Sequence, residues 1–520
     1  MRGGFYRHLS QISKSTERYN LAAMDKQRRK WLWPTTLGAI ALLGFGLVWA
    51  STIWGAGLIS DSFQYVSTAR NLAGGLGFQF EVGKSLLPLV HYPPLFPSVL
   101  AGFEIAGIDA LLGARLINAL LFGANAVLVG VSIEKITASK VWGSIGALLT
   151  AIAAVLLGVH SWALSEPLYI FLGLVGWLIL SQYLENNQLR LLVAASGLFG
   201  LAFLARYAGV AIVVAGALAV LLFSTQNWRK RGMDAALLGI ISVSVSGLWA
   251  VRITLLAGSF GARELQYIPL TAGNIESLLN NILTWVVPFP LVNGREAWIL
   301  FGLFIGLVVF GLYVRVSDLK VKEIVWSEKT LFRLHSLYFW VYPVSVVAAK
   351  MFLDRGIGLN DRMLSPMLVS LMIVGVSIVA QVWKMDQRRW VRVVLVSGAV
   401  LFTAFYGVET GLAMRSFRGE GLGLARADWH SAESIQAFAD FEDEEFYSNS
   451  PSSLYLWSYK PANNLNSFAR MAASADPDRA YIVVFAHVPT NKNIEEMAEG
   501  VELVVGDEVA EVYLFVPEGE

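Results

Sequence analysis

The sequence predicts an all-α polytopic membrane protein with a small extracytoplasmic α/β domain at its C-terminal end. Of its 520 residues, 55% are hydrophobic and only 15% are charged, which is too apolar for a water-soluble fold. Apolar runs of about 20 residues, the length needed to cross about 30 Å of hydrocarbon as a helix, recur along most of the chain. After residue 426 the pattern changes to short β-branched and aromatic runs, which are typical of strands.

Charge and cysteine content exclude several classes of protein. The net charge is +1, but residues 426–520 contain 18 acids and 5 bases, so no nucleic-acid partner is expected. The chain has no cysteine, which excludes a disulfide framework and a thiolate metal site. Residues 1–32 are basic and polar without a signal-peptide cleavage pattern, so we expect a cytoplasmic segment followed by an uncleaved anchoring span.

Basic segments set the predicted orientation of the membrane helices. The segments EKITASK, NWRKRG, RVSDLKVKEIVWSEK and KMDQRRWVR all fall on the cytoplasmic side when eleven spans are drawn, as the positive-inside rule requires. The expected spans are residues 33–53, 112–133, 141–158, 167–184, 190–205, 208–224, 234–256, 297–314, 333–352, 363–383 and 391–412.

This arrangement requires residues 95–107 to lie at the membrane surface, because another crossing would put the basic segments on opposite sides. That run has only about 13 residues, which suits an interfacial helix. The membrane domain, residues 33–412, then carries large outer loops at 54–111 and 257–295, and residues 413–520 form the outer domain. In this domain we expect strands at 444–450, 480–486, 501–507 and 510–516 and helices at 428–440 and 493–500.

A polar stretch directly after the first span carries the first candidate site residue. The segment LISDSFQYVSTARNLAGGLGF predicts a helix that Ser60 or Asp61 caps and that Gly74 and Gly75 end. Tyr65 follows Asp61 at i+4, so the two lie on the same side of this helix. Asp61 is then either a helix cap only or an acid aimed away from lipid on the outer face.

Two further segments place polar groups on the same face. In HYPPLFPSVLAGFEIAGI the proline pair fixes the chain before a short helix and leaves His91 and Tyr92 at its polar edge, although proline pairs also simply start helices. In HSWALSEPLYIF, Glu166 stands at the outer membrane boundary. It either extends into water or points into a cavity shared with Asp61.

Two arginines stand at outer helix ends with few other positive charges on that side. They are Arg206 in FLARYAGV and Arg362 in LNDRMLSPML. Each guanidinium can pair with the acids or hold a phosphate with its planar fork. The alternative is that both anchor the chain at lipid headgroups.

The order of these segments resembles a known superfamily. The chain contains DSFQYVSTARNLAGGLGF, YPPLFPSVLAGFEIAGI, ARLINALLFG, ALSEPLYIFLGL, LAFLARYAGV and NDRMLSPML, and it ends in a domain with FYSNSPSSLYLW. This pattern is similar to the GT-C superfamily of membrane glycosyltransferases. It is most similar to the glycosyltransferase family 39-like branch, which holds protein O-mannosyltransferases and lipid A aminoarabinose transferases.

The resemblance implies a reaction and roles for named residues. The family transfers a sugar from a polyprenyl-phosphate carrier to an acceptor on the extracytoplasmic side, and the acceptor is a lipid, a polysaccharide or a protein. By this likeness Asp61 matches the acid of the first outer loop, a general base or acceptor-orienting group, and Glu166 matches the acid of the second. Tyr65, His91 and Tyr92 are expected to contact the substrate. A single displacement with inversion at the anomeric carbon is also implied.

Two positions depart from the family pattern. Many relatives carry a second acid directly after the first, where this chain has Ser62, so a paired-carboxylate mechanism is not expected. The aminoarabinose transferases have a lysine before the two prolines, where this chain has Tyr92. The cation that holds the donor phosphate must therefore lie elsewhere, and Lys84, Arg206 and Arg362 are the candidates, in rising order of preference.

A lipid flippase or secondary transporter is the alternative from another class. It predicts inverted repeats and helices broken near mid-membrane, whereas the charged residues of this sequence gather at one face. The outer acids form no compact cluster, so a metal-independent enzyme without a cofactor is expected. The protein is expected in the plasma (inner) membrane of a prokaryote, with its N-terminus in the cytoplasm and its C-terminal domain outside.

Overall fold

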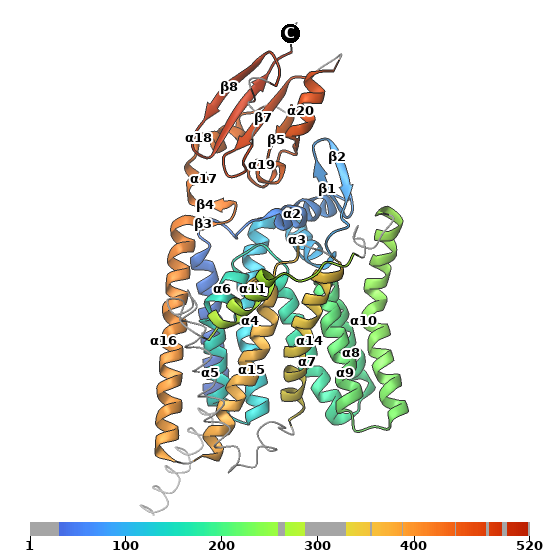
Figure 1. Ribbon diagram of the computed structural model, residues 1–520, viewed down its shortest axis with the longest axis vertical. Helices are drawn as coiled ribbons and strands as arrows, with labels where there is room; N and C mark the ends of the chain where they lie inside the picture. Colours follow the sequence, from blue (N-terminus) through green and yellow to red (C-terminus); the bar gives the residue numbers. More distant parts are fainter. Residues whose placement is uncertain are drawn as a thin grey trace, which may run out of the picture.

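The computed structural model describes residues 31–257, 266–286 and 329–517, apart from short gaps at 354–355, 387, 442–443, 475–477, 491–493 and 495–496. The described chain forms a helical bundle with a small sheet domain stacked on one end (Figure 1). The coarse fold class predicted from the sequence, a helical membrane domain followed by a small α/β domain, is therefore confirmed. The predicted span at 297–314 lies outside the described residues.

Five helices of the described chain are long and apolar enough to cross a membrane, or up to seven if each of two bent pairs counts as one span. The predicted number of eleven is therefore not established. The five are Trp31–Ser51, α4 (Ala110–Thr137), α7 (Glu166–Asn186), α15 (Asp361–Met385) and α16 (Arg389–Glu420). Three more bundle helices are α8 (Leu189–Ala205), α9 (Val210–Phe223, preceded by the 3-10 turn η1, Tyr207–Gly209) and α14 (Thr330–Phe352).

The two bent pairs depart from the straight spans that the sequence predicts. Helices α5 (Lys140–Ala151) and α6 (Ala154–His160) meet at an angle of 60°. The Thr410 hydroxyl on α16 donates to the Ile152 carbonyl at 2.5 Å, which satisfies a backbone acceptor that the break exposes. Helix α10 (Trp228–Ala257) bends by 46° near its middle.

Several short elements cover the end of the bundle that faces the sheet domain (Figure 1). Helix α2 (Ser60–Ala73) lies across this end, and α3 (Leu95–Ile105) packs beneath it. A hairpin of β1 (Gln79–Val82) and β2 (Ser85–Pro88) rises beside α2. The α3 helix has 11 residues and does not span the bundle, in accord with the interfacial helix predicted at 95–107. Helix α11 (Ala272–Thr284) lies within the predicted loop 257–295, of which the structure describes residues 257 and 266–286.

The C-terminal domain is built on a five-stranded sheet of order β6-β5-β7-β9-β8. The β5 strand pairs in parallel with β6 and β7, whereas β7–β9 and β8–β9 are antiparallel. All four predicted strands are present. The strands are β5 (Glu445–Ser448), β6 (Asn463–Asn464), β7 (Ala480–Phe485), β8 (Val501–Gly506) and β9 (Ala510–Phe515).

Helices cover this sheet and a small hairpin leads into it. The hairpin strands are β3 (Gly421–Leu422) and β4 (Ala425–Arg426), and the helices are α17 (Ala427–Ser431), α18 (Glu433–Gln436), η4 (Ala437–Ala439), α19 (Pro451–Ser458) and α20 (Leu465–Ala472). The predicted helix at 428–440 is thus split into short turns. The helix predicted at 493–500 is wrong for its described residues, 494 and 497–500, which form bends and turns, while 493, 495 and 496 lie outside the described chain. Because α16 continues to Glu420, the sheet domain begins later than the predicted residue 413.

Candidate active site

Helix α2 places Asp61 at its first turn, at the end of the bundle that faces the sheet domain (Figure 1). The helix begins after Ile59, whose backbone N–H donates to the Ser62 hydroxyl at 3.2 Å, and Ser62 in turn donates to the Ala163 carbonyl. The prediction that Ser60 or Asp61 caps this helix is therefore wrong, because Ser62 binds the backbone of the cap residue instead. The Asp61 carboxylate stays available for other partners, near a helix end whose dipole favours negative charge.

Four charged residues from four separate segments meet here, and we call them the charged cluster: Asp61, Glu166, Arg206 and Arg362. Arg362 Nη2 donates to Asp61 Oδ2 at 2.5 Å, and its Nε donates to Glu166 Oε1. Arg206 Nη1 lies 2.5 Å from the same Glu166 oxygen. Arg362 therefore bridges the two predicted catalytic acids, and two positive charges balance two negative ones.

The charged cluster is buried at one side and open at the other. The Glu166 side chain is 1% exposed and that of Arg206 is 11% exposed, whereas Asp61 and Arg362 are 16% and 28% exposed. A buried carboxylate is stable only when it is paired, and Glu166 meets this need with two guanidinium groups. Its second oxygen, Oε2, is buried without a hydrogen-bond partner among the described residues. The more exposed edge of the charged cluster is therefore the one that Asp61 and Arg362 form.

Side chains of α4 fix the loop that presents Glu166. Asn118 donates from its side-chain amide to the carbonyls of Trp162 and Leu164, and Asn125 donates to the carbonyl of Pro167. Glu166 is the first residue of α7, directly before that proline, a position where proline fits because the first helical N–H groups have no partner inside the helix. The backbone on both sides of Glu166 is thus fixed by side chains of α4, which sets the position of the carboxylate.

Each arginine of the charged cluster lies at a helix end, and residues next to it in the chain fix the backbone there. Arg206 follows the last residue of α8 in extended conformation, and the turn into α9 requires Gly209, where a Cβ atom would lie 2.4 Å from Phe203 Cα. Arg362 is the second residue of α15, whose cap Asn360 accepts from the Met363 backbone N–H at 3.1 Å. Both guanidiniums are therefore aimed at Glu166 by backbone geometry.

Tyr92 and Tyr65 border Asp61, as the sequence predicts. The Tyr92 hydroxyl donates to Asp61 Oδ1 at 2.8 Å, and burial together with the Asp61 charge raises the pKa of Tyr92 above its ordinary value. This phenol therefore remains a donor at neutral and moderately alkaline pH. Tyr65 is buried, its ring packs against Tyr92 and Phe96, and its hydroxyl lies 3.4 Å from Ser165 Oγ. Tyr65 thus forms part of the buried side of the site.

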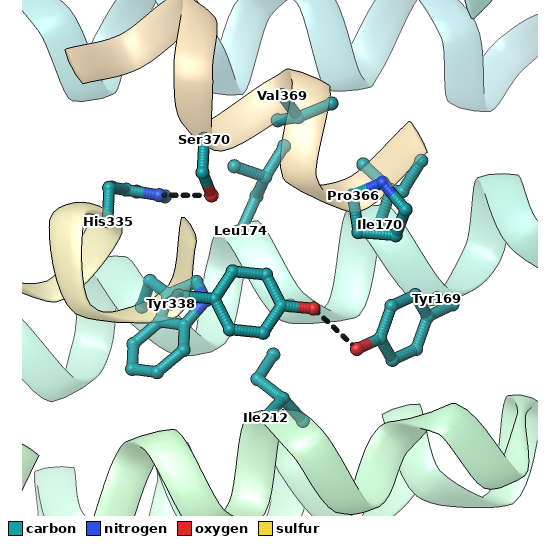
Figure 2. Close-up of a pocket in the computed structure, with 11 residues that line it drawn as sticks. Tyr169, Ile170, Leu174, Ile212, His335, Tyr338, Pro366, Val369 and Ser370 are labelled. Carbon is teal, nitrogen blue, oxygen red and sulfur yellow. Dashed lines mark hydrogen bonds between the residues drawn. The ribbon is translucent and has the colours of Figure 1, made fainter. Parts of the chain in front are cut away.

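A layer of aromatic side chains closes the charged cluster toward the bundle interior. Figure 2 shows the hydroxyls of Tyr169 and Tyr338 facing each other, 2.5 Å apart, and the His335 ring turned toward Ser370. Tyr169 lies one turn after Glu166 on α7. The cavity among these residues is only about 20 Å³, the room of one water molecule. It is therefore too small to admit a substrate from the membrane interior.

Lys84 and His91 lie outside the charged cluster. Lys84 stands in the turn between β1 and β2, is 72% exposed, and pairs with Glu445 of the C-terminal domain at 2.8 Å. The structure thus gives Lys84 a carboxylate partner on another domain and gives no support to its predicted contact with the donor phosphate. His91 is exposed directly before Tyr92.

The sequence interpretation missed two residues of the site. Ser165 lies within hydrogen-bonding distance of Tyr65 and Arg206, and the Met363 sulfur accepts from Arg206 at 3.2 Å. Each directly neighbours a predicted site residue in the chain, and that adjacency was the only available signal. Within the described residues, no group of three or more His, Cys, Asp or Glu side chains is arranged to hold a metal ion.

Comparisons with known proteins identify the fold. No protein-family model matches the sequence, and no curated protein matches it closely enough to count as a relative. Among solved structures, ArnT from Cupriavidus metallidurans bound to undecaprenyl phosphate matches with a TM-score of 0.59 at 12% identity, over 94% of this chain and 98% of that chain.

Two other structures share this arrangement. The oligosaccharyltransferase from Archaeoglobus fulgidus in its apo form matches with a TM-score of 0.50 at 13% identity, over 88% of this chain and 70% of that chain. Arabinofuranosyltransferase AftD from Mycobacteria matches with a TM-score of 0.53 at 12% identity, and the 95% of this chain that aligns spans 40% of that protein. These matches show that the chain has the GT-C fold, as its sequence resemblance predicts.

Proposed function

We propose that this protein is an integral membrane glycosyltransferase that moves a sugar from a polyprenyl-phosphate donor to an acceptor hydroxyl on the extracytoplasmic face. The observation that carries the proposal is Arg362, which bridges the acids Asp61 and Glu166 at the outer end of a GT-C bundle. The likeness to ArnT, which was solved with undecaprenyl phosphate, supports a lipid-linked donor.

In this proposal the two arginines hold the phosphate of the donor. Arg206 and Arg362 are the guanidiniums of the charged cluster, and planar guanidinium forks suit phosphate oxygens. Glu166 accepts from both and so sets their spacing. A donor phosphate that reaches Arg362 competes with Asp61 for its N–H groups, which releases the Asp61 carboxylate toward the acceptor.

Asp61 then serves as the general base of a single displacement. It accepts the proton of the acceptor hydroxyl while the acceptor oxygen bonds to the anomeric carbon. The bond between that carbon and the phosphate oxygen breaks, and its electron pair leaves on the phosphate, which the arginines stabilise. Attack opposite the leaving phosphate inverts the anomeric carbon. Tyr92 orients the carboxylate through its hydrogen bond, and the exposed His91 beside it is proposed to contact the substrate.

We also propose that the reaction needs no metal ion. Both acids of the charged cluster are already paired with guanidiniums, so the positive charge that stabilises the leaving phosphate comes from the chain itself. Treatment with a chelator is expected to leave turnover unchanged. Loss of turnover that Mn²⁺ or Mg²⁺ restores would contradict this assignment.

The experiment uses purified protein in lipid nanodiscs with a panel of polyprenyl-phosphate sugars and candidate lipid, polysaccharide and peptide acceptors. Release of polyprenyl phosphate is followed by mass spectrometry for wild type, Asp61→Asn, and the control Asp428→Asn, which changes a half-exposed aspartate on the C-terminal domain. We expect release that needs an acceptor, falls at least about 100-fold in Asp61→Asn, and is unchanged in the control.

Two results would overturn the proposal. Equal release by wild type and Asp61→Asn would remove Asp61 from the mechanism. Carrier movement across the bilayer without any sugar transfer would identify a flippase instead.

A further inference from the structure

Arg70, nine residues after Asp61 on α2, lies where the membrane domain meets the C-terminal domain. Its Nη2 pairs with Asp109 at 2.7 Å and its Nε lies 3.5 Å from Glu104. On its other side the guanidinium lies 3.9 Å from the ring centre of Tyr459 and 5.6 Å from that of Tyr455. One largely buried cation therefore joins α2 to the start of α4 and to the α19 segment of the sheet domain.

The α19 segment contacts α2 at a second point nearer Asp61. The Tyr455 ring meets the Phe63 ring edge to face, 5.2 Å between centres, and Phe63 is two residues after Asp61. Tyr455 is 3% exposed and belongs to the hydrophobic core of the bundle rather than to that of its own domain. The sheet domain thus contributes a side chain to the core on which α2 rests.

A third contact fixes the hairpin that packs against α2. The Gly83 backbone N–H donates to the Ala462 carbonyl at 3.0 Å, and a Cβ atom at Gly83 would lie 2.0 Å from Asn463 Oδ1. A side chain at this position would have to displace the Asn463 amide, and the φ of +54° also favours glycine here. Together with the adjacent ion pair of Lys84 and Glu445, this contact leaves the two domains little freedom to move apart.

From these contacts we infer that the C-terminal domain acts as a clamp on α2 and that Arg70 is a positioning residue for Asp61. The inference rests on the proposed function for its catalytic consequence only. Helix α2 is a short rigid rod of about 1.5 Å per residue, so a tilt at Arg70 displaces the carboxylate at its other end. A displacement of about 1 Å at a reacting group is enough to slow catalysis by about 100-fold.

The test compares Arg70→Met with Arg70→Lys and uses two readouts. Hydrogen exchange of the α2 backbone amides is expected to rise at least about tenfold in Arg70→Met, because the cation–π and ionic contacts are lost. Turnover is expected to fall about 10- to 100-fold while the donor KM changes less than about threefold. The lysine variant keeps the charge and should recover part of both effects.

Variants on the other side of the contact keep the test decisive if Arg70→Met folds poorly. Tyr459→Ala removes the ring and should reproduce the loss, whereas Tyr459→Phe removes only a 3.4 Å contact to Asp109 and should behave as wild type. The matched control is Arg479→Met, which breaks an ion pair with Glu444 inside the C-terminal domain and should change neither readout.

The outcomes separate the clamp from the transferase. Unchanged α2 exchange in both Arg70→Met and Tyr459→Ala would overturn the clamp. Faster exchange with unchanged turnover would overturn the role of Arg70 in positioning Asp61. If no donor supports transfer by wild-type protein, the proposed function fails, yet the exchange measurement still decides whether the domain holds α2.

Discussion

Replacing Glu166 with glutamine tests whether the charged cluster is a phosphate site. In the native protein the Glu166 carboxylate accepts from both Arg206 and Arg362, so an incoming phosphate must share these cations with it. Glutamine keeps the size and one acceptor oxygen but removes the negative charge. We therefore expect Glu166→Gln to bind polyprenyl phosphate more tightly while transferring sugar more slowly.

The magnitude follows from the charges. Two unit negative charges roughly 5 Å apart at an effective dielectric constant of about 20 repel each other by about 3 kcal/mol. Because Arg362 is 28% exposed, solvent screening lowers this figure, and half of it is a reasonable lower bound. An affinity gain of roughly 10- to 100-fold is expected. The same change leaves a buried guanidinium without a full counter-charge, which destabilises the fold by about 3 kcal/mol.

The assay titrates polyprenyl phosphate into the protein in nanodiscs and measures the dissociation constant, with thermal unfolding as a check that the variant is folded. Glu433→Gln, which neutralises an exposed acid on α18, serves as the control and should leave affinity unchanged. Weaker or unchanged binding by a folded Glu166→Gln protein would refute the assignment of Arg206 and Arg362 to the phosphate.

Two smaller predictions concern the neighbours of this site. Tyr92→Phe removes the hydrogen bond to Asp61, an interaction with a charged acceptor worth about 1.5–3 kcal/mol, so turnover should fall about tenfold or more with little change in the donor KM; equal turnover would exclude an orienting role. The second concerns acid pH and the domain contact of Glu445. Burial raises the pKa of Glu445, but hydrogen bonds from Lys84 and Tyr447 outweigh burial and hold it below its ordinary value. This contact therefore stabilises the protein above pH about 4.3 and is lost as the pH falls further. Exchange of α2 amides should increase in that range for wild type and less for Glu445→Gln, which lacks the titrating group.

The sequence predicted which site residues lie at helix ends better than it predicted the ion pairs between them. Glu166, Arg206 and Arg362 were expected at helix ends because each follows or opens an apolar run, and the structure places all three at helix ends, with both arginines in contact with Glu166. That Arg362 joins both acids could not be predicted, because the joining depends on how α2, α7 and α15 pack. Lys84 was the least preferred of the three candidate cations in the sequence, and a two-stranded hairpin carries it to Glu445.

Other differences have local physical reasons. The break between α5 and α6 falls in TAIAAV, which contains neither proline nor glycine, so no local signal marks it in the sequence. The Ile152 carbonyl at the break accepts a hydrogen bond from Thr410, which lies on a helix distant in sequence. Ser62, which the family comparison marked only as a missing acid, binds the cap of α2 and the Ala163 carbonyl. The number of spans stays open because the apolar helices Leu189–Ala205 and Tyr207–Phe223 have no more than 17 residues each, short for a membrane crossing, and because residues 287–328 lie outside the described chain.

The β3–β4 segment returns to the segment just before α2, where Leu58 exchanges backbone hydrogen bonds with Leu422 and Leu424. Nearby, His430 bonds to the Trp54 carbonyl from 376 residues further along the chain. Contacts this distant in sequence form late, because the intervening loop must close first. During synthesis, only a chain completed through residue 424 can gain these contacts. Folding of the protein is thus expected to end with the meeting of its first loop and its last domain, so a chain released early would remain without a held α2.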